Sequence, residues 1–173
     1  MCRVAVARSE PAEPVELDLS EMIGHLLRAC QQLDVAIWSG VFPAGPTSPQ
    51  FAVLHALAHE GPLNQTALRS KARLDRSSAA DVIRRLVARR LVSQVRDPAD
   101  ARRKVVRLTN AGRAVYAEAT GRAQRVNEAM LDGMAGPDRA TLTGLLNSLL
   151  QHHRGLLDYQ ADEAAVGGTA ARP

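Results

Sequence analysis

Residues 74–109 read LDRSSAADVIRRLVARRLVSQVRDPADARRKVVRLT, and this run contains the most informative structural signals in the chain. Asp75 is a residue type that caps helices, so we expect a helix to begin beside it. The buried stripe of that helix would comprise Ala79, Ile83, Leu86 and Val87. Two β-prone segments, 91–95 and 105–108, then flank the polar turn 97–103. The run therefore predicts a helix followed by a β-hairpin with a basic tip.

Three further helices are expected before this run. Thr47 and Gln50 have the spacing of a capping box, and the helix that they start would end at Gly61. Asn64 can cap a short helix that closes near Ala72. The first helix is indicated by a heptad seam formed by Leu19, Ile23, Leu26, Cys30, Leu33 and Ile37. Helices followed by a hairpin in this order are typical of a winged helix-turn-helix.

Two helices are expected after the hairpin. Thr109 can cap a long helix that reaches about Leu131, and a last helix would follow Pro137. The last helix has the strongest apolar stripe in the chain, formed by Leu142, Leu145, Leu146, Leu149, Leu150, His153, Leu156 and Leu157. The first and last helices present more apolar surface than a small winged helix can cover. We therefore expect them to pack on each other and on a second copy, as a homodimer.

Charge is concentrated in one part of the chain. The 173 residues contain 22 Lys and Arg against 18 Asp and Glu, a net charge of +4. Residues 61–107 contain 13 of the basic residues and four acidic ones, so this run carries +9 and the remainder −5. Such a block indicates a polyanionic partner. We expect double-stranded DNA with a pseudo-palindromic operator, contacted by Arg76, Ser77, Ser78, Asp81, Arg84, Arg85, Arg96, Asp100, Arg102, Arg103 and Lys104.

The fold class that follows is mainly α with a small β-hairpin wing, a winged helix-turn-helix with flanking dimerisation helices. The expected divisions are a flexible N-terminal lead at 1–16, an N-terminal dimerisation helix at 17–45, the DNA-binding winged helix-turn-helix at 46–109, C-terminal dimerisation helices at 110–160 and a disordered tail at 161–173. Asp81 could accept from a cytosine amino group, but we expect it to orient Arg84 or Arg85 instead.

Several classes of protein are disfavoured. The sequence has no phosphate-binding glycine loop, no G-x-S-x-G and no HExxH, so we expect no enzyme activity, no cofactor and no catalytic residues. His55 and His59 have metal-ligand spacing, but no nearby Glu or Cys completes a set, so no metal site is expected. Two cysteines and no apolar run of membrane-spanning length favour a cytoplasmic location without a membrane partner.

The sequence resembles the MarR family of bacterial transcriptional regulators from about Leu17 to Leu157. The sharpest match is Asp97-Pro98-x-Asp100-x-Arg102-x-x-x-Val106-x-Leu108-Thr109-x-x-Gly112. Two further matches are Pro49-Gln50-Phe51-x-x-Leu54 and Leu74-Asp75-Arg76-Ser77-Ser78, the latter leading to Arg85-Leu86.

The resemblance implies a homodimeric winged helix that usually represses nearby genes. It also implies a response to phenolic or other aromatic carboxylates, and in some members to thiol oxidation or metal. Arg102 would enter the minor groove, and Asp100 would hold the arginines of the wing. The chain departs from the family at Arg90, where relatives often have Gly, so a left-handed residue there would cost about 1 kcal/mol. It also departs at Asn64, which replaces the commoner Thr or Ser cap.

The sequence indicates the effector and its pocket less clearly than it indicates the fold and the DNA-binding residues. Candidate pocket residues are Cys30, Asp34, Trp38, His55 and His59. Trp38 could wall a pocket but is better explained as a core anchor, and Cys30 is better explained as a buried, inert thiol. Two alternatives stay open: a winged-helix module that binds a protein instead of DNA, and a redox-sensing regulator that acts through Cys30.

Overall fold

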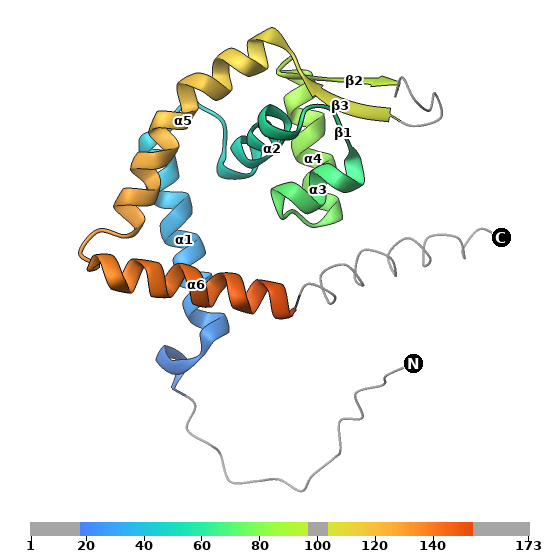
Figure 1. Cartoon of the computed structure of the whole chain (residues 1–173). Helices are drawn as coiled ribbons and strands as arrows, with labels where there is room; N and C mark the ends of the chain where they lie inside the picture. The colour runs from blue at the N-terminus through green and yellow to red at the C-terminus, as the bar shows by residue number, and fades with distance from the viewer. Residues whose placement is uncertain (1–17, 97–103, 154–173) are drawn as a thin grey trace, which may run out of the picture.

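The computed structural model describes residues 18–96 and 104–153 (Figure 1). The elements in chain order are η1 (Leu19–Glu21), α1 (Ile23–Val41), α2 (Ser48–Glu60), β1 (Leu63–Asn64), α3 (Gln65–Ala72), α4 (Arg76–Ala88), β2 (Val92–Arg96), β3 (Lys104–Leu108), α5 (Asn110–Met130) and α6 (Gly136–His152). The predicted fold class, mainly helical with a small antiparallel hairpin, is confirmed. The lead at 1–16, the hairpin tip and the tail at 161–173 lie outside the described residues.

Side-chain caps start four of the helices where the sequence predicts them. Thr47 and Gln50 form the complete capping box at the start of α2. Asn64 accepts from the Ala67 amide at 2.8 Å, and Asp75 accepts from the Ser78 amide at 2.9 Å. Thr109 accepts from the Gly112 amide at 3.0 Å. Each cap satisfies a backbone donor that has no partner within the helix, which fixes these four boundaries.

The first helix begins later than the heptad seam predicts. Asp18 accepts from the Ser20 amide, but the turn that it caps is η1, and Met22 then takes an extended backbone conformation. The α-helix proper begins at Ile23. The cap therefore serves a single 3₁₀ turn, because the chain direction changes at Met22 before α1 starts.

The sheet has three strands in the order β1-β3-β2. β2 and β3 form the predicted hairpin, with Val92 opposite Leu108 and Arg96 opposite Lys104. The sequence did not predict β1, which pairs only two residues with β3. A strand this short has no periodicity of its own and exists because the edge of β3 lies beside it.

Two apolar clusters form the interior. The larger joins α2, α3, α4 and the sheet, with Leu54, Leu68, Ile83 and Leu86 fully buried. The smaller lies between α1 and α5 and is formed by Trp38, Phe42, Ala119 and Val126. One expectation is wrong: Val87 is exposed, and Val82 takes its place in the buried face of α4. Val82 completes a stripe with Ala79, Ile83 and Leu86, whereas Val87 lies at its edge.

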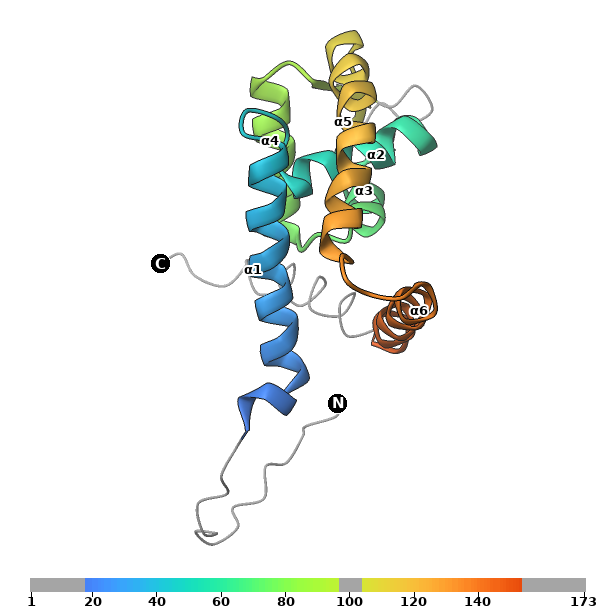
Figure 2. The same cartoon turned by 90° about the vertical axis from the view of Figure 1, so that its left-hand side faces the viewer.

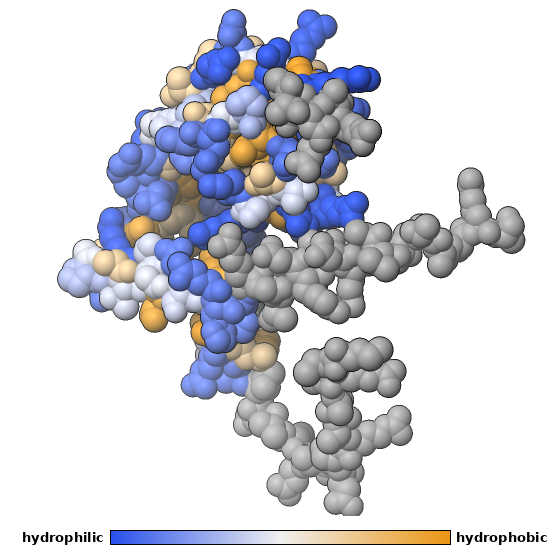
Figure 3. All heavy atoms as spheres, turned by 45° about the vertical axis from the view of Figure 1, so that its right-hand side comes forward, coloured by the Kyte–Doolittle hydropathy of each residue, from blue (hydrophilic) through white to orange (hydrophobic). Residues whose placement is uncertain are grey.

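Helices α1 and α5 lie side by side and form an arm that extends from the winged-helix unit, which comprises α2, α3, α4 and the sheet (Figures 1 and 2). Helix α6 follows the far end of α5 and lies apart from α1 (Figure 2). Most of the seam on α1 faces outward in the single chain, so Cys30, expected to be buried, is exposed. Apolar patches appear on this lower part of the molecule (Figure 3). The exposed large apolar residues of η1, α1, the residue between them and α6 are Leu19, Met22, Ile23, Leu26, Leu27, Leu33, Val35, Leu145, Leu146, Leu149 and Leu150.

Within residues 18–96 and 104–153, none of the helices combines the length and apolar character needed to cross a membrane.

Candidate functional site

The outer face of α4 carries a compact charged and polar group. Arg76, Ser77, Arg84 and Arg85 are all exposed on it. Asp81 forms ion pairs with both Arg84 and Arg85, the latter through Oδ2 and Nε at 2.7 Å. These ion pairs are the contacts expected if Asp81 orients the two arginines. The pairing holds two guanidinium groups in a fixed relation while leaving most of each one open to solvent.

The N-terminus of α4 is tightly organised by one carboxylate. Asp75 accepts from the Ser78 amide at 2.9 Å and from the Ser77 hydroxyl at 2.7 Å. Hydrogen bonds from Ser78, and then from Ser77, hold the pKa of Asp75 well below its usual range. The carboxylate therefore stays ionised, and Ser77 and Ser78 are positioned by their contacts with it.

The hairpin carries basic residues towards its tip. Arg96 and Lys104 are exposed and face each other across the last described pair of β2 and β3. Arg107 donates to the Ser93 hydroxyl at 3.3 Å. Asp100, Arg102 and Arg103 lie outside the described residues. The described part of the hairpin therefore carries exposed positive charge on its last residue pair.

The root of the hairpin is fixed by a left-handed residue and a close backbone contact. Arg90 has a φ of 57°, as the sequence predicts for a position where relatives often have Gly. The Thr109 hydroxyl donates to the Arg90 carbonyl oxygen at 2.8 Å. Gly112 lies so close to the Leu91 carbonyl that a Cβ could not fit there. These contacts join α4, the hairpin and α5 into one unit.

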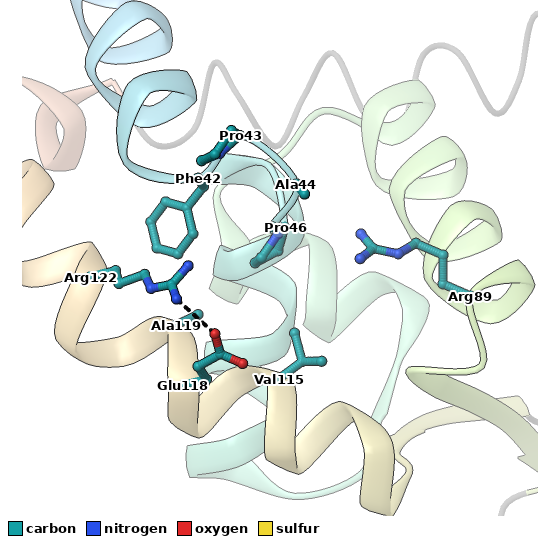
Figure 4. Close-up of a pocket in the computed structure, with 10 residues that line it drawn as sticks. Phe42, Pro43, Ala44, Pro46, Arg89, Val115, Glu118, Ala119 and Arg122 are labelled. Atoms are coloured by element: carbon teal, nitrogen blue, oxygen red, sulfur yellow. Dashed lines mark hydrogen bonds and ion pairs between the residues drawn. The ribbon is translucent and has the colours of Figure 1, made fainter.

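A cavity of about 250 Å³ lies between the α1–α2 connection, the end of α4 and α5, where the winged-helix unit meets the arm (Figure 4). It is lined by Phe42, Pro43, Ala44, Gly45 and Pro46 from the α1–α2 connection, Arg89 from the end of α4, and Val115, Glu118, Ala119 and Arg122 from α5. Glu118 and Arg122 form an ion pair at 2.9 Å. Arg89 enters from the opposite side and donates to the neutral Gln50 Oε1 at 3.1 Å. The lining therefore carries one positive charge that the Glu118 carboxylate does not balance.

None of the five residues that the sequence suggests for an effector pocket lines this cavity. Trp38 is buried behind Phe42, stacks on its ring at 4.7 Å and donates to the Pro46 carbonyl at 2.7 Å, which supports its reading as a core anchor. Cys30 is exposed on α1, and Asp34 is half-buried there. His55 and His59 instead meet Tyr116 of α5.

Sequence reasoning missed Arg89, Glu118 and Arg122 as cavity residues. From the sequence, Arg89 is explained equally well as a residue that complements the helix dipole or as a DNA contact. Glu118 and Arg122 have the i, i+4 spacing of an ordinary surface ion pair. The lining comes from three separate segments, so no local pattern could have assembled it.

Comparisons with known proteins give a consistent result. The model of the MarR family matches residues 44–103. The HTH-type transcriptional repressor NicR of Pseudomonas putida KT2440 is 30% identical over 151 residues, which cover 87% of this chain and 96% of NicR.

Two solved structures are similar over most of their length. PcaV of Streptomyces coelicolor, determined with its natural ligand, is 36% identical, with a TM-score of 0.74 over 79% of this chain and 97% of PcaV. BpsR of Bordetella bronchiseptica, whose DNA binding is regulated by 6-hydroxynicotinic acid, is 34% identical. Its TM-score is 0.73 over 77% of this chain and 96% of BpsR.

Proposed function

Because this chain belongs to the MarR family of transcriptional regulators, we propose that it is a sequence-specific repressor that binds double-stranded DNA and is released by a small aromatic carboxylate. The observation that carries the proposal is the exposed arginine face of α4 beside a basic hairpin. A helix with exposed polar side chains fits the major groove, and arginine can bind guanine or phosphate with two hydrogen bonds.

In this proposal α4 is the recognition helix. Its arginines contact base edges or phosphates of the DNA. Asp81 orients Arg84 and Arg85 through its ion pairs with them. Arg96, Lys104 and the hairpin tip track the adjacent phosphates, and Arg102 enters the minor groove, where narrow A·T tracts attract arginine. Asp100 holds the arginines of the wing by a charge-assisted contact.

The protein acts as a homodimer through η1, α1 and α6. Their exposed apolar residues support this, since a surface of this kind on a monomer indicates an interaction partner. A two-fold dimer would present two copies of α4 about 34–36 Å apart, one helical turn of DNA. This arrangement matches a pseudo-palindromic operator.

The cavity between the winged-helix unit and the arm receives the effector. Phe42 and Pro46 supply apolar walls, and Arg89 supplies a guanidinium whose partner is uncharged. One unbalanced positive charge favours a monocarboxylate over a neutral or dianionic ligand. The response of BpsR to an aromatic acid supports the same ligand class.

Release requires that the DNA-bound and free conformations bind the effector differently, because a ligand shifts an equilibrium only by that difference. The cavity contacts the last residues of α4 through Arg89 and the arm through α5. A ligand between them changes the position of α4 relative to its twin, and operator affinity falls.

The test is Arg102→Ala, with Arg125→Ala on the exposed surface of α5 as the matched control. We expect Arg102→Ala to weaken operator binding and to leave the dimer intact, whereas Arg125→Ala binds as the unmodified protein does. Fluorescence anisotropy across a salt series gives a log–log slope of about −0.9 per neutralised phosphate. Unchanged binding by Arg102→Ala would show that the wing assignment is wrong. Binding without salt dependence would instead favour a protein-interaction module.

A further inference from the structure

Three side chains outside the cavity converge on one point between α2 and α5. His55 Nδ1 and His59 Nε2 each lie 3.0 Å from the hydroxyl oxygen of Tyr116. The two histidines sit one helical turn apart on α2, with ring centroids 4.3 Å apart. Phe51 stacks on the Tyr116 ring at 5.7 Å and fixes its orientation. Three groups that can each bind a metal through nitrogen or oxygen therefore share one small volume.

The cluster is open to solvent. Both histidines are exposed, and Tyr116 is half-buried. A phenol has one proton, so Tyr116 can donate to only one of the two rings and must accept from the other. Glu60, which follows His59 in the sequence, is paired with Lys71 at 2.6 Å. Among the described residues no group of three His, Cys, Asp or Glu side chains offers an alternative metal site.

The two separations from the Tyr116 oxygen to the histidine nitrogens are compatible with right-angled coordination of one metal ion. Two ligand atoms that each bind one metal at about 2.1 Å lie about 3.0 Å apart when the angle between them is about 90°. A tetrahedral angle would separate them by about 3.4 Å. The observed separations from Tyr116 to each histidine are 3.0 Å. Tetragonal geometry with nitrogen and oxygen ligands is preferred by Cu²⁺ and Ni²⁺.

The chemistry of the three side chains allows them to bind a metal. A neutral imidazole presents the lone pair that a metal needs, and a phenol binds through its oxygen once its proton has left to solvent. Each metal ion bound would therefore release the Tyr116 proton together with any proton carried by the histidines.

We propose that His55, His59 and Tyr116 form a binding site for a divalent transition metal of the Cu²⁺ and Ni²⁺ class, with water completing the coordination. The bound ion joins α2 of the winged-helix unit to α5 of the arm. It lies apart from the effector cavity, since none of the three residues lines that cavity. The site uses none of the residues that are proposed to contact DNA or the effector.

The test uses the full chain and NiCl₂ as the probe, with binding measured by calorimetry and thermal unfolding. We expect one Ni²⁺ per chain and a rise in melting temperature, because a ligand of the folded state stabilises it. His55→Ala and His59→Ala should each lower affinity at least about tenfold, a loss of about 1.4 kcal/mol. Replacing His152 and His153 with Ala, at the end of α6, is the matched control and should change nothing.

A spectroscopic experiment tests the role of Tyr116 separately. In a variant with both cysteines replaced by Ser, so that no thiol reduces the metal, CuCl₂ should produce a phenolate-to-copper charge-transfer band. Tyr116→Phe keeps the ring stacked on Phe51 and should abolish the band. The proposal is overturned if Ni²⁺ binds the two single histidine variants as tightly as the unmodified chain. It is equally overturned if binding depends on His152 and His153, or if the band is absent or survives in Tyr116→Phe.

Discussion

Arg89, at the end of α4, donates to the side-chain oxygen of Gln50, at the start of α2, at 3.1 Å. Gln50 is buried, and the same oxygen accepts from the Thr47 backbone amide at 3.3 Å. The guanidinium also lines the cavity between the winged-helix unit and the arm. One side chain thus connects the proposed recognition helix, the capping box of α2 and the proposed effector site.

Arg89→Met keeps the length of the side chain and removes its charge. We expect binding of an aromatic monocarboxylate to weaken about 10- to 100-fold, since a hydrogen bond to a charged group contributes about 1.5–3 kcal/mol. A thermal-shift series with 6-hydroxynicotinic acid and related acids measures the change. Arg125→Met, on α5 but outside the cavity, is the control. Equal responses from the two variants would remove Arg89 from the effector site.

Gly112 and Gly121 occupy the same helix but opposite environments. A Cβ at Gly112 would overlap the Leu91 carbonyl, whereas at Gly121 it would meet nothing within 4 Å. Gly112→Ala should lower the free energy of unfolding by about 1–3 kcal/mol through overpacking against backbone. Gly121→Ala should raise it by about 0.5–1 kcal/mol, because alanine favours the helix. Urea denaturation of both variants decides the matter, and shifts of the same sign would contradict the close contact at Gly112.

Asp75 makes the stability of α4 depend on pH. Asp75→Ala should lower the free energy of unfolding by about 1 kcal/mol at pH 7 through loss of the cap. Hydrogen bonds from Ser78 and Ser77 depress the pKa of Asp75 in the folded chain, so its charged form stabilises the fold above the unfolded pKa of about 3.9. That contribution is lost as pH falls below this value.

The difference between the unmodified chain and Asp75→Ala should therefore be smaller near pH 3 than near pH 7. Asp75→Asn retains a side-chain acceptor but no carboxylate. At pH 7 it should lower the free energy of unfolding by less than Asp75→Ala does. A difference that stays constant between the two pH values would argue against the ionised cap. Chemical denaturation at each pH provides the measurement.

The exposed leucines of α6 test the proposed dimer. Leu149→Glu removes apolar surface and places a charge in the interface. The dissociation constant of the dimer should therefore rise about 10-fold or more, because about 1.5–3 kcal/mol of leucine burial is lost. Sedimentation velocity across a concentration series reports the change. Ser148→Glu, the exposed polar neighbour, should leave the dimer intact. A dimer that tolerates Leu149→Glu must use another surface.

Local chemistry was enough to predict most of the winged-helix unit. Each helix cap depends on a hydrogen bond to a residue three positions along the chain, so each can be predicted from the sequence. The caps are Thr47, Asn64, Asp75 and Thr109. The left-handed turn at Arg90 followed from the family pattern. The pairing of Asp81 with Arg84 and Arg85 follows from helical spacing alone.

The order of elements, their caps and the basic face beside the hairpin therefore follow from local sequence. The two-residue strand β1, the cavity around Arg89 and the contacts of His55 and His59 with Tyr116 arise only when the helices pack together. The difference lies in distance along the chain. A cap or ion pair within one helical turn is set by local geometry, whereas Tyr116 reaches His55 across 61 residues only because α5 packs on α2.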